Sequence, residues 1–295
     1  MQVWRIHIRP KGGRGDYAYA FDVCRRQGVV GVGWQVERAN AEGLTLEEYL
    51  RRARDTYPDS WSSCRSAVGA LAAMVQEDLV WTRDTHGIYW LGLVEGPWEY
   101  RDTPENCDAD IANVRPARLI EVGTIARVPG KVIASMRSRR TVQKVEGQDI
   151  KIYSRWLFAK LSGEMTPSLP GARDVFEFLS DQDCEDIVFV FLQRHGWVVF
   201  PARRQADTMA YEYVLHATDD GREATVQVKT GQTPGDFHTL PGGRQAFVFQ
   251  PNGAYQGRQP EHVQVIGRDE ILAFMRENRP LLPDIVKDWM DIVGA

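Results

Sequence analysis

The sequence predicts a mixed α/β (α+β) protein with a small β-barrel carrying helices, followed by a mixed sheet flanked by helices. The chain has 295 residues, enough for two domains. Its first half contains short apolar runs separated by polar turns, which is typical of a compact barrel with few helices. Its second half begins with a helical pattern, continues through several strands and ends with helices, which is typical of a mixed α/β domain.

The first half gives a series of short elements with recognisable boundaries. Thr45 precedes an amphipathic pattern and is expected to open a helix. Two apolar runs around residues 80 and 90 are separated by a polar turn and predict paired strands. The expected strands cover 29–34, 78–81, 87–94, 114–122 and 124–128, and the expected helices cover 46–55, 66–74 and 151–161.

A segment rich in Gly, Pro and Ser/Thr, residues 162–171, is the best linker candidate. We therefore expect a first domain at 1–160, a linker at 161–172 and a second domain at 173–295. In the second domain, helices are expected at 181–194, 268–278 and 281–293, and strands at 197–200, 211–215, 224–229, 245–250 and 262–266.

The composition favours a soluble protein of the cytoplasm. Apolar runs stay below the roughly 18 residues of a membrane span, and the first residues do not read as a signal peptide. The four cysteines are dispersed without a Cys-x-x-Cys pair, so neither a zinc site nor a disulfide framework is expected.

Charge is distributed unevenly along the chain. Residues 1–165 carry 24 Lys/Arg and 21 Asp/Glu, whereas residues 166–295 carry 12 and 19. Basic clusters lie at 51–54 and 137–140, where they serve either as a nucleic-acid contact or as an ordinary solvated face. In the acidic second half, a contact with nucleic acid needs a local site and a metal ion to offset the charge.

Two alternating runs in the second half predict a β-hairpin whose end carries polar side chains. Residues 211–215 and 224–229 alternate as half-buried strands do, and an Asp-Gly turn joins them. The hairpin is expected to bring Glu212, Gln227 and Lys229 close together. A carboxylate, a second oxygen ligand and an ammonium at one end of a sheet can bind a divalent cation and position a phosphate. This pattern predicts nuclease chemistry.

Residues 175–275 resemble the Mrr-like branch of the PD-(D/E)xK restriction endonucleases. The matching pieces are a helix that carries Glu185 and ends at 192–197, Glu212 on one strand, and Gln227-Val228-Lys229 on the next. The family places (D/E/Q)-x-K at this last position, and the Mrr-like branch often has Gln there.

The resemblance implies a role for each matching residue in metal-dependent phosphodiester hydrolysis. Glu212 would be the main carboxylate ligand of Mg²⁺ or Mn²⁺, and Gln227 would add an amide oxygen. The backbone carbonyl of Val228 would be a further ligand, and Glu185 would contact the metal or its water. Lys229 would orient or deprotonate the attacking water and stabilise negative charge in the transition state.

Two positions leave alternatives open. Asp207 competes with Glu212 for the first acidic position, and Glu212 is preferred because it falls within a strand while Asp207 reads as loop. The family usually places a longer helix after the lysine. Residues 232–244 contain several Pro and Gly residues, so this crossover is expected to be short or irregular.

The first half is rich in tryptophan, which predicts either a barrel core or a pocket that stacks a flat base. Six of the nine tryptophans lie in the first 100 residues. Trp34, Trp81 and Trp90 are the candidate pocket walls. Asp78 and Arg83 are the candidates for contacts with the edge of the base, although Asp78 is equally compatible with a turn.

Residues 1–145 resemble the EVE/PUA-like domains, which are small barrels. The similarity rests on the segments 30–34, 78–81 and 89–100, with their Gly-Val-Gly-Trp and Trp-Leu-Gly-Leu patterns. Several relatives recognise modified bases in DNA or RNA, so the resemblance implies a base-reading domain.

Together the two resemblances imply a type IV-like (Mrr-like) restriction endonuclease of bacterial antiphage defence. Its first domain would engage a modified base, and its second would cut the DNA. Cutting both strands with one active site per chain indicates a homodimer, or two copies that meet on DNA. The alternatives are a non-catalytic nucleic-acid-binding protein with a degenerate nuclease fold, and a defence effector whose first domain senses a small nucleotide or a phage protein.

Overall fold

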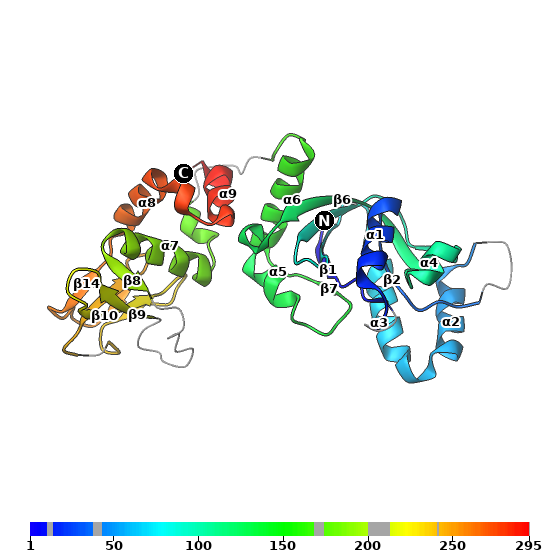
Figure 1. Cartoon of the computed structure of the whole chain (residues 1–295), viewed down its shortest axis with the longest axis horizontal. Helices are drawn as coiled ribbons and strands as arrows, with labels where there is room; N and C mark the ends of the chain where they lie inside the picture. The colour runs from blue at the N-terminus through cyan, green and yellow to red at the C-terminus, as the bar shows by residue number, and fades with distance from the viewer. Residues whose placement is uncertain (11–13, 38–42, 168–173, 200–212, 241, 295) are drawn as a thin grey trace. The chain divides into compact units, whose positions relative to one another are not determined.

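A computed structural model describes residues 1–10, 14–37, 43–167, 174–199, 213–240 and 242–294 of the chain (Figure 1). The chain divides into two compact units, Met1–Pro167 and Ser168–Ala295. The division falls within 161–172, the segment expected to be the linker. Each unit has its own sheet and helices, so each is described by itself.

The first unit contains a seven-stranded sheet with the order β2-β6-β4-β3-β1-β7, to which β5 is added on β6. β1 and β3 run parallel, and the other neighbours are antiparallel. The strands are β1 (Val3–Ile6), β2 (Val29–Val32), β3 (Leu79–Arg83), β4 (Tyr89–Val94), β5 (Glu99–Tyr100), β6 (Asn113–Gly123) and β7 (Val142–Lys144).

The long strand β6 gives this sheet its curvature. Residues 113–116 pair with β2, and residues 117–123 pair with β4. Because β6 pairs with β2 along its first part and with β4 along its second part, the sheet curls into a half-barrel (Figure 1). The expected combination of a curled β-structure and a second α/β sheet is thus present in the two units.

Helices are more frequent in the first unit than the sequence indicated. They are α1 (Tyr17–Gln27), α2 (Leu46–Thr56), α3 (Trp61–Ala72), α4 (Pro104–Asp108), α5 (Gly130–Ser135) and α6 (Gln148–Ser162). Thr45 caps α2 as predicted, because its side chain accepts a hydrogen bond from the backbone N–H of Glu48. The strand predicted at 124–128 is wrong: β6 ends at Gly123, whose φ is +105°, and Ile125–Arg127 form a 3₁₀ turn.

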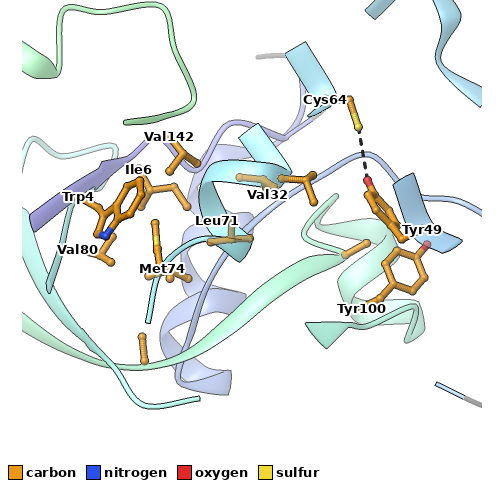
Figure 2. Close-up of a cluster of buried hydrophobic side chains, with 14 of the residues drawn as sticks. Trp4, Ile6, Val32, Tyr49, Cys64, Leu71, Met74, Val80, Tyr100 and Val142 are labelled. Carbon is orange, nitrogen blue, oxygen red and sulfur yellow. Dashed lines mark hydrogen bonds between the residues drawn. The ribbon is translucent and has the colours of Figure 1, made fainter. Parts of the chain in front are cut away.

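The core of the first unit lies between the half-barrel and α3. Figure 2 shows Trp4, Ile6 and Val80 of the sheet near Leu71 and Met74. At the other end of the same cluster, the hydroxyl of Tyr49 lies 3.6 Å from the thiol of Cys64 (Figure 2). This cluster includes Val32 at the end of β2 and Cys64 near the start of α3. The cavity described below lies next to these two places.

The second unit contains a five-stranded sheet with the order β14-β12-β10-β9-β8. β10, β12 and β14 are parallel, whereas β9 runs antiparallel to both β10 and β8. The strands are β8 (Trp197–Val199), β9 (Tyr213–Ala217), β10 (Glu223–Val228), β12 (Gln245–Phe249) and β14 (Val263–Val265). The predicted hairpin is confirmed for its described part, from Tyr213 onward.

Three helices and a small second sheet complete the described part of the second unit. The helices are α7 (Asp181–Arg194), α8 (Arg268–Glu277) and α9 (Asp284–Val293). α7 begins and ends at the predicted residues and packs against β8 and β10 (Figure 1). β11 (Gly235–Asp236) and β13 (Tyr255–Gln256) pair in parallel within the connections between the parallel strands.

The crossover from β10 to β12 is irregular, as predicted. Its described residues contain β11 and no α-helix. Phe237 and Leu240 of this crossover pack on Val248, so it covers the sheet face where a crossover helix would otherwise lie. In the described part of the chain, no helix combines the length and apolarity needed to cross a membrane. All four cysteines are free thiols.

Candidate functional site

Gln227 and Lys229 lie at the carboxyl end of β10, in the middle of the second sheet. Gln227 is 1% exposed, and its side-chain N–H donates to the hydroxyl of Thr239 at 3.4 Å. Lys229 directly follows the strand and is partly exposed, while its backbone N–H donates to the carbonyl of Phe249 at 2.9 Å. The parallel pairing with β12 therefore holds the backbone rigid up to the lysine, whose side chain reaches solvent.

Glu185 lies on α7 and is held against the hairpin by Tyr213. The hydroxyl of Tyr213 donates to Oε2 of Glu185 at 3.2 Å. The ring of Tyr213 packs edge-on against Phe189, with 3.8 Å between the ring centroids. Because Glu185 and Phe189 are one helical turn apart, both anchor the same face of α7 to β9.

Glu185 and Gln227 approach the hairpin from opposite faces. Tyr213 and Val226 are direct partners in the β9–β10 ladder, so their side chains share the face that α7 covers. Side chains alternate along a strand, and Gln227 therefore extends from the other face, toward Thr239. A site that uses both residues has to form around the end of β10.

The first turn of α7 lies next to that strand end. Thr230, two residues after β10, donates a hydrogen bond to Asp181, the first residue of α7. Asp181 and Glu185 are four residues apart and therefore lie on one side of the helix. The sequence interpretation did not identify Asp181 as a site residue. The spacing of four residues between Asp181 and Glu185, on the helix that precedes the hairpin, could have indicated it.

The chemistry of these donors fits a hard divalent cation, although the described residues do not complete a site. Asp181 and Glu185 offer carboxylate oxygens and Gln227 an amide oxygen, which are ligand types that Mg²⁺ accepts. Within the ranges that the structure describes, no group of three or more His, Cys, Asp or Glu is arranged to hold a metal ion. Both candidates for the first acidic position, Glu212 and Asp207, lie outside the described residues. The first acidic ligand that the sequence predicts is therefore not among the described residues.

In the first unit, a cavity of about 580 Å³ lies where β2 ends, and we call it the Trp34 cavity. Trp34 lies two residues after β2, and Tyr57 follows α2. The lining residues are Arg9, Gly33, Trp34, Tyr57, Ser60, Ser63, Asp110, Arg139 and Thr141. Burial and the nearby charge of Asp110 raise the pKa of the Tyr57 hydroxyl. The cavity thus combines aromatic walls, one carboxylate and two guanidinium groups.

The other predicted pocket residues have different surroundings. Trp81 is fully buried in the core, and its indole N–H donates to the hydroxyl of Ser154 at 3.0 Å. Trp90 packs against Phe21 at 5.4 Å between ring centroids, and its indole N–H lies 3.3 Å from Asp84. The structure therefore places both rings in packing positions.

Asp78 and Arg83 also lie away from the Trp34 cavity. Asp78 is 1% exposed and accepts hydrogen bonds from the backbone of Gln2 and Val75 and from the indole of Trp4, which is the turn role considered for it. Arg83 lines a separate cavity of about 340 Å³, and Arg9 lines both cavities.

Positive charge accumulates around Arg9. Burial, together with the charges of Arg5 and Arg9, lowers the pKa of His7 to about 4. Arg139 brings the predicted basic cluster at 137–140 to the Trp34 cavity. An anionic ligand is the complementary partner for this side of the unit.

The second basic cluster forms a hollow of about 760 Å³ on α2 and α3. Its lining residues are Leu50, Arg51, Arg54, Asp55, Trp61 and Arg65. Near the start of α3, Ser60 and Ser63 line the Trp34 cavity, whereas Trp61 and Arg65 line this hollow. The two sites are therefore neighbours across one helical turn.

No protein-family model matches the chain, and no curated protein matches it. Among solved structures, the chain is similar to the DNA modification-dependent restriction endonuclease AspBHI. The sequence identity is 13% and the TM-score is 0.23, with 99% of this chain and 84% of that chain covered. A likeness of this size does not establish a shared fold, so function has to be argued from the residues of this chain.

Proposed function

We propose that the chain is a metal-dependent DNA endonuclease whose first unit selects DNA that carries a modified base. The observation that carries the proposal is the β9–β10 hairpin, which presents Gln227 and Lys229 at a strand end beside the carboxylates of α7. In this proposal the second unit has the Mrr-like PD-(D/E)xK fold and the first unit the EVE/PUA-like fold.

The residues at the strand end have distinct roles in hydrolysis of the phosphodiester. Bound to oxygens of Glu212, Glu185 and Gln227, with the carbonyl of Val228 as a further ligand, Mg²⁺ or Mn²⁺ would polarise the phosphate and lower the pKa of a water molecule. The ammonium of Lys229 holds the attacking water or the phosphate oxygens and stabilises negative charge as the water oxygen bonds to phosphorus. The attacking water loses a proton to solvent, the bond from phosphorus to the leaving oxygen breaks, and the leaving oxygen takes a proton from solvent.

Asp181 contributes to the position of this site without being required as a ligand. Its carboxylate accepts a hydrogen bond from Thr230, which ties the first turn of α7 to the end of β10. This contact keeps Glu185, one helical turn further on, next to the hairpin.

The first unit supplies the contact with DNA. The Trp34 cavity has the aromatic walls that stack a flipped base. Arg9 and Arg139 at this cavity, and Arg51, Arg54 and Arg65 in the neighbouring hollow, provide cations for the phosphate backbone. Each chain has one strand-end site, so cutting both strands requires two copies.

A non-catalytic nucleic-acid-binding protein is the second candidate. It is favoured by one observation: the described residues hold no group of three acidic, His or Cys ligands. In such a protein, the aromatic and basic sites of the first unit would bind nucleic acid, and the hairpin would be structural.

Cleavage of DNA with defined base modifications tests the proposal. The protein is incubated with duplexes carrying normal, methylated or glucosylated cytosine, with Mg²⁺, Mn²⁺ or excess chelator. We expect nicks or breaks in a modified duplex, no cleavage in chelator, and loss of cleavage in Glu212→Gln but not in the control Glu277→Gln. Tight DNA binding without cleavage of any duplex would favour the second candidate.

A further inference from the structure

We infer that the Trp34 cavity takes a nucleobase that carries an exocyclic amino group, and that Asp110 is the residue that selects it. This inference rests on the proposed role of the first unit as a reader of bases. It adds the chemical class of the base and the group that recognises it.

The wall of the cavity is held rigid by a set of buried and partly buried hydrogen bonds. The segment 33–36 follows β2, and each of its four residues is fixed through its backbone. Side chains of Asn113, Tyr49, Tyr57 and Tyr100 donate, in that order, to the carbonyls of Gly33 (2.6 Å), Trp34 (2.9 Å), Gln35 (2.6 Å) and Val36 (2.6 Å). A loop held at every residue presents its side chains in one arrangement.

Two lining residues have a backbone conformation that side chains other than glycine rarely adopt. Trp34 has φ of +62° and Asp110 has φ of +52°. Such residues concentrate at ligand sites, where surrounding contacts hold them in place. Here the hydrogen bond from Tyr49 holds Trp34, and the two strained residues line the same cavity.

Gly33 allows the Asp110 carboxylate to lie against this wall. A Cβ atom placed on Gly33 would lie 2.5 Å from Cγ of Asp110, closer than real side chains approach. The glycine thus leaves the space that the carboxylate occupies, at the residue before Trp34. An aromatic side chain and an acceptor therefore line the same cavity.

The Asp110 carboxylate selects by hydrogen bonding. It accepts hydrogen bonds and donates none, so it favours a base edge that presents N–H groups. Cytosine, adenine and guanine carry an exocyclic amino group that donates to such an acceptor. In thymine the single ring N–H lies between two carbonyl oxygens. The negative carboxylate repels these oxygens, so thymine is a poorer partner. Stacking on Trp34 is similar for every base, so discrimination falls to Asp110.

The cations of the cavity complete a nucleotide site. Arg9 and Arg139 line it together with the hydroxyls of Ser60, Ser63 and Thr141. Guanidinium and hydroxyl groups are suitable donors for phosphate oxygens. The ligand chemistry is thus an amino-bearing base with a phosphate, from a free nucleotide or from a nucleotide flipped out of DNA.

Calorimetric binding of single nucleotides tests the inference without requiring cleavage. The full chain is titrated with dCMP, dAMP, dGMP and TMP, and with duplexes containing one mismatched C or T. We expect at least one amino-bearing nucleotide to bind about tenfold or more tightly than TMP. If the protein binds only the mismatched duplexes and prefers C to T, the cavity takes bases flipped out of DNA. If it also binds the free nucleotides, the cavity takes both free nucleotides and flipped bases.

Asp110→Asn is the decisive variant, because asparagine also tolerates a positive φ and offers donors in addition to an acceptor. It should reduce the preference for amino-bearing bases to about threefold or less, whereas the exposed control Asp108→Asn should keep it. Trp34→Ala should weaken binding of every base, and circular dichroism shows whether each variant is folded.

Equal affinity for dCMP, dAMP, dGMP and TMP would overturn the inference, as would unchanged selectivity in a folded Asp110→Asn variant. These outcomes are separable from failure of the proposed function. If Glu212→Gln abolishes DNA cleavage but Asp110→Asn leaves it unchanged, only the inference about Asp110 is refuted. If the protein binds amino-bearing bases selectively but cleaves no DNA, only the proposed nuclease activity is refuted.

Discussion

His7 provides a quantitative test of its partly buried, positively charged surroundings near Arg9, a residue that also lines the Trp34 cavity. Burial and the guanidinium groups of Arg5, Arg9 and Arg83 lower the pKa of His7 from 6.5 to about 4 in the folded protein. In the unfolded chain the imidazole is expected to titrate near its ordinary value. The unfolded state therefore binds a proton more readily than the folded state between these two pH values.

This difference makes stability depend on pH. The contribution is fully present above pH 6.5 and is lost as the pH falls toward 4, because the unfolded state gains the proton first. The difference between 6.5 and about 4 corresponds to about 3 kcal/mol at most. His7 is only partly buried, and solvent screening reduces the expected loss to about 1–2 kcal/mol.

Two measurements on wild type and His7→Gln test this expectation. Nuclear magnetic resonance follows the imidazole, and urea denaturation at pH 7.5 and 5 gives the stability. We expect a midpoint near 4, a loss of about 1 kcal/mol at pH 5 that His7→Gln does not show, and a rise of the midpoint when an oligonucleotide neutralises the arginines. A midpoint near 6.5 in the free protein would refute the partly buried and positively charged environment inferred from the structure.

Three further changes have defined outcomes. Tyr49→Phe removes the hydroxyl that donates to the carbonyl of Trp34 and should lower the free energy of unfolding by about 1–3 kcal/mol in urea denaturation. Unchanged stability would contradict the role of this hydrogen bond in holding the segment 33–36. Replacing both Arg54 and Arg65 with Gln should reduce the slope of log Kd for DNA against log salt concentration by about 1–2. An unchanged slope would show that the DNA backbone does not contact this hollow. Glu185→Gln should weaken the stabilisation of the second unit by Mn²⁺ in thermal melts, and equal stabilisation would remove Glu185 from the metal site.

Local patterns in the sequence were sufficient for most of the second unit. α7 was predicted at its observed residues because an apolar face recurs with the helical period. In the structure, the side chain of Ser180 caps its start. The β9–β10 hairpin was predicted from alternation and the Asp-Gly turn between the strands, and the described part of the two strands pairs as a hairpin does. These features depend on neighbours in the sequence, which is why they could be read from it.

Long-range packing decided what the sequence could not indicate. Trp81 and Trp34 look alike as aromatic residues after apolar runs, yet one is buried beneath α6 and the other lines a cavity. Asp110 lies against Gly33 only because the fold brings together residues about 75 positions apart in the sequence. The short β11 and β13 strands likewise form because two separate connections meet, not because either has a strand pattern.

The rate of cleavage of one modified duplex by the Lys229→Met variant tests the central claim most directly. Lys287, the other lysine of the second unit, gives the matched control, Lys287→Met. At equal protein and metal concentrations, we predict that Lys229→Met lowers the cleavage rate at least a hundredfold, while DNA binding and the folded structure are retained. Cleavage at the wild-type rate by a folded Lys229→Met protein would contradict the assignment of a nuclease site to the end of β10.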